Sequence, residues 1–150
     1  MQKIEFAEPL LQEYQYALLF SLKDPQRELN SACRKVGERF GGKGVKIKDM
    51  DEFSLLFADF LKNYLKMVEV VFVDYNKDTL SISIEGCKFC PANTQYKIET
   101  SEKAVCPLGG LVRGALKNVE GKMKTFKWLK TDKPPETVGV CTTTYEVKIE

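Results

Sequence analysis

The pattern of the chain changes at residues 70–85, which read VVFVDYNKDTLSISIE. Residues 70–73 are β-branched or aromatic, a composition that favours a mostly buried strand. Polar residues 76–78 indicate a turn, and residues 79–85 then alternate between polar and apolar side chains. Because side chains in a strand point to opposite faces in turn, this alternation predicts a half-buried strand. The stretch therefore predicts a β-hairpin and the beginning of a sheet.

The preceding residues, 1–68, carry apolar side chains at helical spacing instead. Pro9 and Pro25 each fit the first turn of a helix, where the missing N–H of proline costs nothing, and Asp24 fits the N-cap before Pro25. Asp49 has the chemistry of an N-cap for a third helix. The apolar stripe of that helix is expected to extend to Val68. The first 68 residues thus predict a helical half.

Residues 69–150 predict a sheet half. After the hairpin we expect a cysteine loop, then a short helix over residues 107–118 and strands over residues 123–130 and 144–149. The predicted fold class is α+β, with N-terminal helices packed on one face of a four-stranded, mainly antiparallel sheet. A chain of 150 residues has the usual size of a single domain, so residues 1–150 are expected to form one.

Charge and composition exclude several classes of protein. Lys and Arg number 23 against 21 Asp and Glu, which leaves a net charge of only +2 and favours no nucleic-acid partner. No apolar run approaches the roughly 20 residues that span a bilayer, and the N-terminus lacks the pattern of a signal peptide. We therefore expect a soluble, cytoplasmic protein. The sequence contains no histidine, which excludes Ser-His-Asp and Cys-His catalysis and histidine metal ligands.

Four of the five cysteines are candidate ligands of a structural zinc ion. Cys87 and Cys90 form a C-x-x-C motif directly after the predicted hairpin, so one loop presents two sulfurs to one metal. Cys106 precedes the short helix, whose dipole favours the thiolate that binds metal. Cys141 lies just before the last strand, which could bring it beside the Cys87 loop. Cys33, the fifth cysteine, lies on an apolar helix face and is expected to belong to the core.

Other uses of these cysteines remain open. One disulfide, joining Cys87 to Cys90 or Cys106 to Cys141, would need no metal. Glu85 could serve as the fourth ligand if Cys141 does not. A redox C-x-x-C fits less well, because such motifs precede a helix in a βαβ unit, whereas this motif follows a hairpin strand.

Three segments carry a resemblance to a known family. Residues 106–116, CPLGGLVRGAL, look like the cysteine-led, glycine-studded helix of the 4-vinyl-reductase domain family. Residues 122–130 and 140–147 fit the strand, the last cysteine and the closing strand that follow in that family. The resemblance covers about residues 68–150. The N-terminal helices match the family in type of secondary structure but not in sequence motif.

The resemblance implies an α+β fold that is shared with vesicle-tethering subunits and haem-nitric-oxide domains. It also implies binding of a small hydrophobic molecule and a cysteine-rich zinc site to which Cys106 and Cys141 correspond. The family's Glu-x-x-Cys stretch is absent from residues 133–137, so Cys87 and Cys90 are expected to replace those ligands.

Glycines and aromatic residues complete the candidate sites. Gly110 and Gly114 form a small face that is expected to pack the short helix tightly on the sheet. The aromatic residues between the third helix and the sheet either fill the core or, as the resemblance implies, line a ligand pocket; they are Phe57, Phe60, Tyr64, Phe72 and Trp128. Arg113 is either solvated or an anchor for a ligand carboxylate.

The leading functional hypothesis is a zinc-stabilised module that binds or senses a small hydrophobic molecule, without catalysis. One alternative is a reductase of a vinyl group on a tetrapyrrole, although the sequence has no nicotinamide or flavin fingerprint. A further alternative is a zinc ribbon that binds nucleic acid. Apolar helical surface beyond what one small sheet covers also predicts a homodimer.

Overall fold

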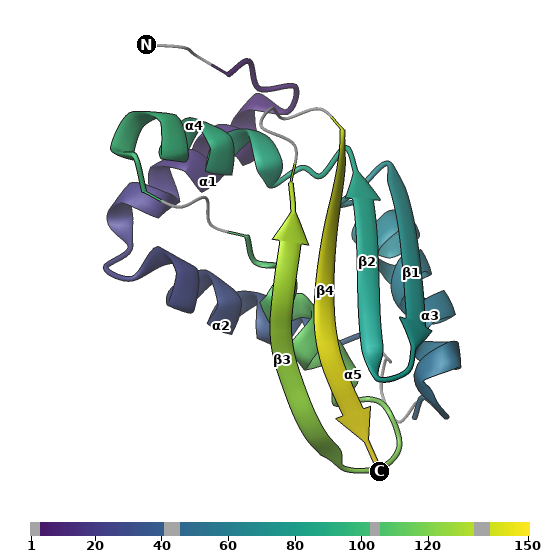
Figure 1. Cartoon of the computed structure of the whole chain (residues 1–150). Helices are drawn as coiled ribbons and strands as arrows, with labels where there is room; N and C mark the ends of the chain where they lie inside the picture. The colour runs from purple at the N-terminus through teal and green to yellow at the C-terminus, as the bar shows by residue number, and fades with distance from the viewer. Residues whose placement is uncertain (1–3, 41–45, 103–105, 134–138) are drawn as a thin grey trace.

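A computed structural model describes residues 4–40, 46–102, 106–133 and 139–150 (Figure 1). Within these residues the elements are α1 (Pro9–Ser21), α2 (Pro25–Glu38), α3 (Met50–Asp59), the π-helical turn η1 (Phe60–Tyr64), β1 (Val70–Asn76), β2 (Thr79–Glu85), α4 (Cys90–Thr100), α5 (Leu108–Leu116), β3 (Met123–Asp132) and β4 (Val140–Ile149). The predicted α+β class is confirmed, with the first helices preceding a four-stranded antiparallel sheet. No helix in these ranges is long and apolar enough to cross a membrane.

The sheet has the strand order β1-β2-β4-β3, and every neighbouring pair is antiparallel. The hairpin between β1 and β2 is the predicted one, and Asn76 pairs with Thr79 across its end. The two loop residues, Lys77 and Asp78, have φ values of 50° and 63°. A two-residue turn with both φ values positive matches the twist of the strands and fixes their register.

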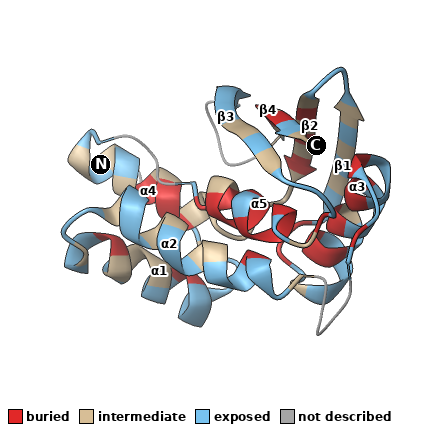
Figure 2. Ribbon diagram, turned by 90° about the horizontal axis from the view of Figure 1, so that it is seen from below, coloured by how far each residue is buried: buried red, intermediate tan, exposed pale blue. Residues whose placement is uncertain are grey.

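The described helices cover one face of the sheet. On that inner face Leu80, Ile82 and Val147 are fully buried, beneath α3 and α5. Figure 2 shows the helices on one side of the sheet, with α5 buried along most of its length between the sheet and α2. Phe72 points to the opposite face, where 66% of its surface is exposed. The core therefore lies in one layer, between the sheet and its two covering helices.

Side-chain caps begin two of the helices, as predicted. The carboxylate of Asp24 accepts a hydrogen bond from the backbone N–H of Arg27. Asp49 accepts one from the N–H of Glu52 at 2.9 Å, and the Glu52 carboxylate accepts one from the N–H of Lys48. Such caps satisfy N–H groups that have no partner inside the helix.

The third helix is shorter than the sequence predicts. Its α-helical part ends at Asp59, and the π-helical turn η1 continues the chain to Tyr64. Phe53 and Phe57 stack with ring centroids 5.1 Å apart, and the ring of Phe40 packs edge-on against both. This aromatic group fills the space between α2, α3 and the sheet.

The prediction of a loop after the C-x-x-C motif was wrong, because helix α4 begins at Cys90 itself. Pro91 lies in its first turn, where a proline fits, and therefore starts the helix rather than breaking it. The motif thus does precede a helix, which removes one argument against a redox role.

Glycines on α2 and α5 bring these two helices into close contact. A Cβ atom on Gly110 would overlap the backbone carbonyl of Asn30, and one on Gly114 would overlap that of Arg34. A Cβ atom on Gly37 would overlap the carbonyl of Leu111 in turn. The small face of α5 therefore packs on α2, and the prediction that it packs on the sheet was wrong.

Candidate functional site

A cleft of about 660 Å³ lies between α2, the beginning of α5 and the inner face of β3 and β4. We call it the basic cleft. Its lining residues are Gln26, Arg27, Asn30, Ser31, Arg34, Cys106, Gly109, Gly110, Arg113, Phe126, Trp128, Thr131, Lys133, Thr143 and Tyr145. Its size falls in the range of clefts that hold small molecules.

Aromatic rings form the sheet side of the basic cleft. Phe126 and Tyr145, from β3 and β4, stack with centroids 5.2 Å apart and planes 18° apart. The guanidinium of Arg113 lies 5.9 Å from the centroid of the Phe126 ring. The indole N–H of Trp128 donates to the hydroxyl of Thr131 at 2.9 Å, which holds the indole in place. The wall is therefore flat, apolar and fixed in orientation.

Four cationic residues line the basic cleft, namely Arg27, Arg34, Arg113 and Lys133, and none of its described lining residues is acidic. Two of the four have carboxylate partners outside the lining. Arg27 lies 3.8 Å from Asp24, and Arg34 lies 3.6 Å from Glu38. Neither Arg113 nor Lys133 makes an ion pair within the described residues.

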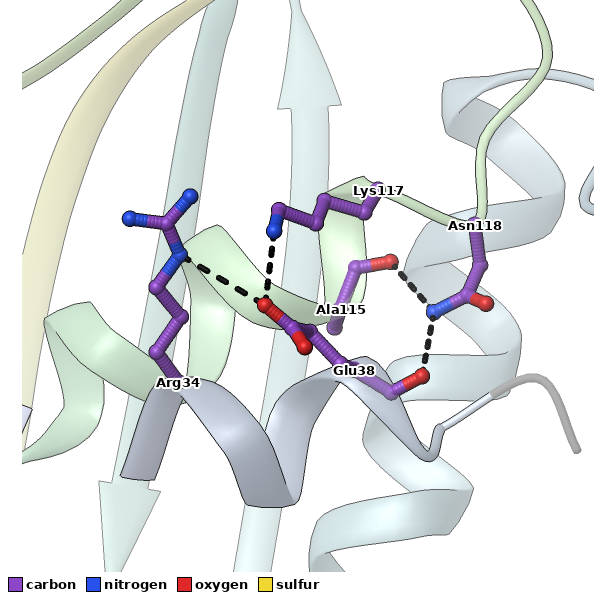
Figure 3. Close-up of polar contacts among 5 residues, drawn as sticks. All are labelled: Arg34, Glu38, Ala115, Lys117 and Asn118. Atoms are coloured by element: carbon purple, nitrogen blue, oxygen red, sulfur yellow. Dashed lines mark hydrogen bonds and ion pairs between the residues drawn. The ribbon is translucent and has the colours of Figure 1, made fainter. Parts of the chain in front are cut away.

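Glu38 fixes the end of α2 that carries Arg34. Figure 3 shows its carboxylate between Arg34 and Lys117, whose ammonium donates to it at 2.7 Å. That hydrogen bond is the main cause that holds the pKa of the Glu38 carboxyl below its usual value. The side-chain amide of Asn118 bridges the carbonyls of Glu38 and Ala115 (Figure 3). These contacts join the C-terminal ends of α2 and α5. They therefore fix the positions of the two helices that line the basic cleft.

Two neutral polar groups at the cleft lack hydrogen-bond partners within the described residues. Tyr145 is only 2% exposed, and its hydroxyl lies 3.7 Å from the position of a Cβ on Gly109. Burial, followed by the nearby thiols of Cys106 and Cys141, raises the pKa of this phenol, so it stays protonated and can donate. The side-chain oxygen of Asn30 is buried and unpaired.

The four predicted zinc ligands, which we call the cysteine group (Cys87, Cys90, Cys106 and Cys141), lie in one region of the fold, near enough to interact electrostatically, and Cys106 lines the basic cleft. Cys141 on β4 pairs with Ile84 on β2, three residues before Cys87. Burial raises the pKa of the thiols at positions 87, 106 and 141, and the nearby charge of Cys90 raises each of them further. All five cysteines are free thiols, so neither disulfide alternative is present.

Backbone N–H groups point at two of these sulfurs. The N–H groups of Phe89 and Cys90 hydrogen-bond to the sulfur of Cys87, and the N–H of Leu108 hydrogen-bonds to that of Cys106. Such bonds lower the pKa of both thiols and so oppose the larger effect of burial. Cys106 is exposed as a residue, whereas its sulfur is surrounded by enough protein for desolvation to dominate.

The cysteine group has the chemistry for a soft metal ion but not a preformed geometry. Four thiols with no histidine suit zinc or iron, although burial outweighs the donated N–H bonds and keeps the pKa of the thiols raised. In the part of the chain that the structure describes, no three Cys, Asp or Glu side chains stand close enough to hold a metal ion. Glu85 does not complete such a group either. Binding a metal would therefore require the sulfurs to move together.

The residues predicted to bind a ligand are distributed over three environments. Arg113 and Trp128 line the basic cleft. Phe57 and Phe60 are buried in the aromatic group under α3. Tyr64 and Phe72 are 72% and 66% exposed, outside that core. The pocket thus lies beside α2 and α5, rather than beneath the third helix.

Sequence reasoning did not single out the residues that α2 contributes to the basic cleft. Arg27, Asn30, Ser31 and Arg34 recur at spacings of three, four and seven residues, which places them on one face of a helix. That polar face is the signal that could have found them. A solvated helix face has the same pattern, which is why the spacing alone did not distinguish the two.

Comparisons with known proteins identify the family but no function. No curated protein matches the chain. A family model, that of the MJ0207 family, matches residues 27–147. The match includes most of α2 and of the sheet, the cysteine group and the described lining of the cleft except Gln26. The match does not connect the chain to the 4-vinyl-reductase domain, so that resemblance stays a prediction. Because the match spans most of the sequence, the chain belongs to the MJ0207 family.

Proposed function

We propose that this protein is a ligand-binding or sensory module that holds a small molecule in the basic cleft. The observation that carries the proposal is the cleft itself, which combines a volume of about 660 Å³ with a fixed aromatic wall. Sites for small molecules are typically concave and mostly apolar, with a few convergent polar groups. The unpaired hydroxyl of Tyr145 is a polar group of this kind.

The chemistry of the lining favours binding over catalysis. Acid–base catalysis needs a group that gains and loses a proton near neutral pH. The Tyr145 phenol, whose pKa burial raises, remains protonated there, and the described lining contains neither a carboxylate nor a histidine. The proposed role is therefore recognition of a molecule, in keeping with the resemblance to a family that binds hydrophobic ligands.

We also propose that one zinc ion, bound by the cysteine group, stabilises the module. Support comes from the electrostatic interaction among four thiols, which belong to the loop before α4, the first residue of α4, the segment just before α5 and the start of β4. A metal at this point would join three segments that lie far apart in the sequence. Structural zinc sites supply folding free energy in this way.

Energy transfer from Trp128 tests the ligand site, because it is the only tryptophan and lines the basic cleft. The probes are the neutral dye N-phenyl-1-naphthylamine and its sulfonated analogue 8-anilinonaphthalene-1-sulfonate. We expect at least one of them to bind and quench Trp128. Gly109→Leu should abolish the response, because a side chain at Gly109 meets only the Tyr145 hydroxyl and extends into the cleft.

The matched control is Gly109→Ala, whose single methyl group leaves most of the cleft open and should preserve binding. Failure of both dyes to quench Trp128 in the unchanged protein would contradict the proposed function. Equal binding to the Gly109→Leu variant would contradict it as well, because the dye would then lie elsewhere.

A further inference from the structure

We infer that the ligand is an organic anion with a flat apolar body, whose anionic group binds between Arg113 and Lys133. This inference rests on the proposed function and names the class of molecule that the basic cleft would take. It differs from the expectation of a neutral hydrophobic ligand in the charge that the molecule must carry.

The first argument is the local charge. The chain as a whole is nearly balanced, with 23 basic and 21 acidic residues, yet the described lining of the cleft has four cations and no carboxylate. Like charges gathered in one cleft repel one another, and low-dielectric walls strengthen that repulsion. An anion in the cleft relieves it.

The second argument identifies which cations remain available. Arg27 and Arg34 each have a carboxylate within 4 Å, at 3.8 and 3.6 Å. Arg113 instead lies over the Phe126 ring, a contact that orients the guanidinium but leaves its charge unneutralised. Lys133 has no carboxylate partner among the described residues. One carboxylate or phosphate group would therefore suffice to complete the site.

The third argument concerns the shape of the rest of the ligand. The stacked Phe126 and Tyr145 rings and the Trp128 indole, held by Thr131, present flat apolar surfaces. Flat rings pack on such surfaces with a gain beyond simple burial of area. A hydrogen bond adds orientation, since the Tyr145 hydroxyl can donate to the ligand.

The size of the cleft limits the ligand to a small molecule. A volume of about 660 Å³ admits a compound of a few fused or linked rings. Nucleic acid is disfavoured, because binding a phosphate backbone needs a basic surface that extends well beyond one cleft.

The two dyes that test the proposed function also test this inference, because they differ only by a sulfonate group. We expect the anionic dye to bind about tenfold more tightly than the neutral one, as a charge-assisted contact typically gives. Arg113→Gln and Lys133→Gln should each weaken the anionic dye by roughly threefold to tenfold and leave the neutral dye unchanged. Arg39→Gln and Lys127→Gln remove the same charges outside the cleft and should change neither affinity.

Displacement of the anionic dye by 1-naphthoate or by 1-naphthyl phosphate then separates a carboxylate ligand from a phosphate ligand. Displacement by either one supports the inference. It is overturned if neither compound displaces the dye, or if the neutral dye binds as tightly as the anionic one. In the second case the proposed function survives, since a ligand still occupies the cleft.

Discussion

The backbone carbonyl of Asn30 packs directly against the α-carbon of Gly110, with no room between them for a methyl group. This contact holds α2 on α5 and so sets one wall of the basic cleft. We expect Gly110→Ala to lower the free energy of unfolding by about 1–3 kcal/mol, since overpacking forces the backbone to shift. Urea denaturation measures the change. Gly109→Ala, one residue earlier in an open position, should cost nothing, and an equal loss in both variants would contradict this account.

Loss of one cysteine of the group should remove the metal. We expect about one zinc ion per chain by elemental analysis, and Cys106→Ser should lower both the zinc content and the melting temperature. The effect should be large, because structural zinc can contribute on the order of 10 kcal/mol of apparent binding free energy. Cys33→Ser is the matched control and should retain its zinc. A metal-free preparation after growth and purification with zinc would rule the site out.

The stability of the protein should depend on the Cys33 thiol in alkaline solution. Burial, and then the nearby Cys106 thiolate, raises the pKa of Cys33 from 9.0 to about 11. Between these values the unfolded chain releases a proton that the folded chain keeps, so its contribution to stability falls as the pH rises. Below pH 9.0 this contribution does not change with pH. Urea denaturation at several pH values should show a shallower decline for Cys33→Ala than for the unchanged protein, and parallel curves would disprove the assignment.

A face of α1 supports the prediction of a homodimer. Leu10 and Tyr14, one helical turn apart, are 89% and 65% exposed, and Leu11 and Phe20 are 45% and 51% exposed. Covering apolar surface is the common reason for association, and symmetric dimers are the commonest outcome. Light scattering should give the mass of two chains, and Leu10→Glu should shift it to that of one. Glu13→Gln, on the same helix, should leave the mass unchanged, and a single-chain mass for the original protein would refute the prediction.

Much of the fold follows from local patterns in the sequence. Alternation predicted β2 because its buried residues recur at every second position, and Asp24 and Asp49 predicted helix starts because short polar side chains cap free N–H groups. Helix α4 was not predicted, because its apolar residues are few and irregularly spaced. Pro91 does not reveal the helix either, because proline is suited both to a break and to a first turn.

The basic cleft could not be predicted in the same way, because it depends on how distant elements pack. Phe57 and Trp128 are both large aromatic residues, and nothing local distinguishes the buried ring from the one that lines the cleft. The difference arises because α3 covers the sheet near β1, whereas β3 lies near the beginning of α5. The C-x-x-C motif and the place of Cys141 in the sequence predicted a shared zinc site, and that site stays a prediction, because no three of these side chains in the described residues stand close enough to hold a metal.

The lining of the basic cleft begins at Gln26 on α2 and ends at Tyr145 on β4, so its walls come from opposite ends of the chain. The two walls stand opposite each other only when the helical half and the sheet half are both folded and docked. A molecule bound between them has no site in the unfolded chain and stabilises the native state by mass action. The melting temperature should therefore rise with the concentration of any ligand that binds the cleft. A library of organic anions can thus be screened for that ligand by measuring the melting temperature with each compound.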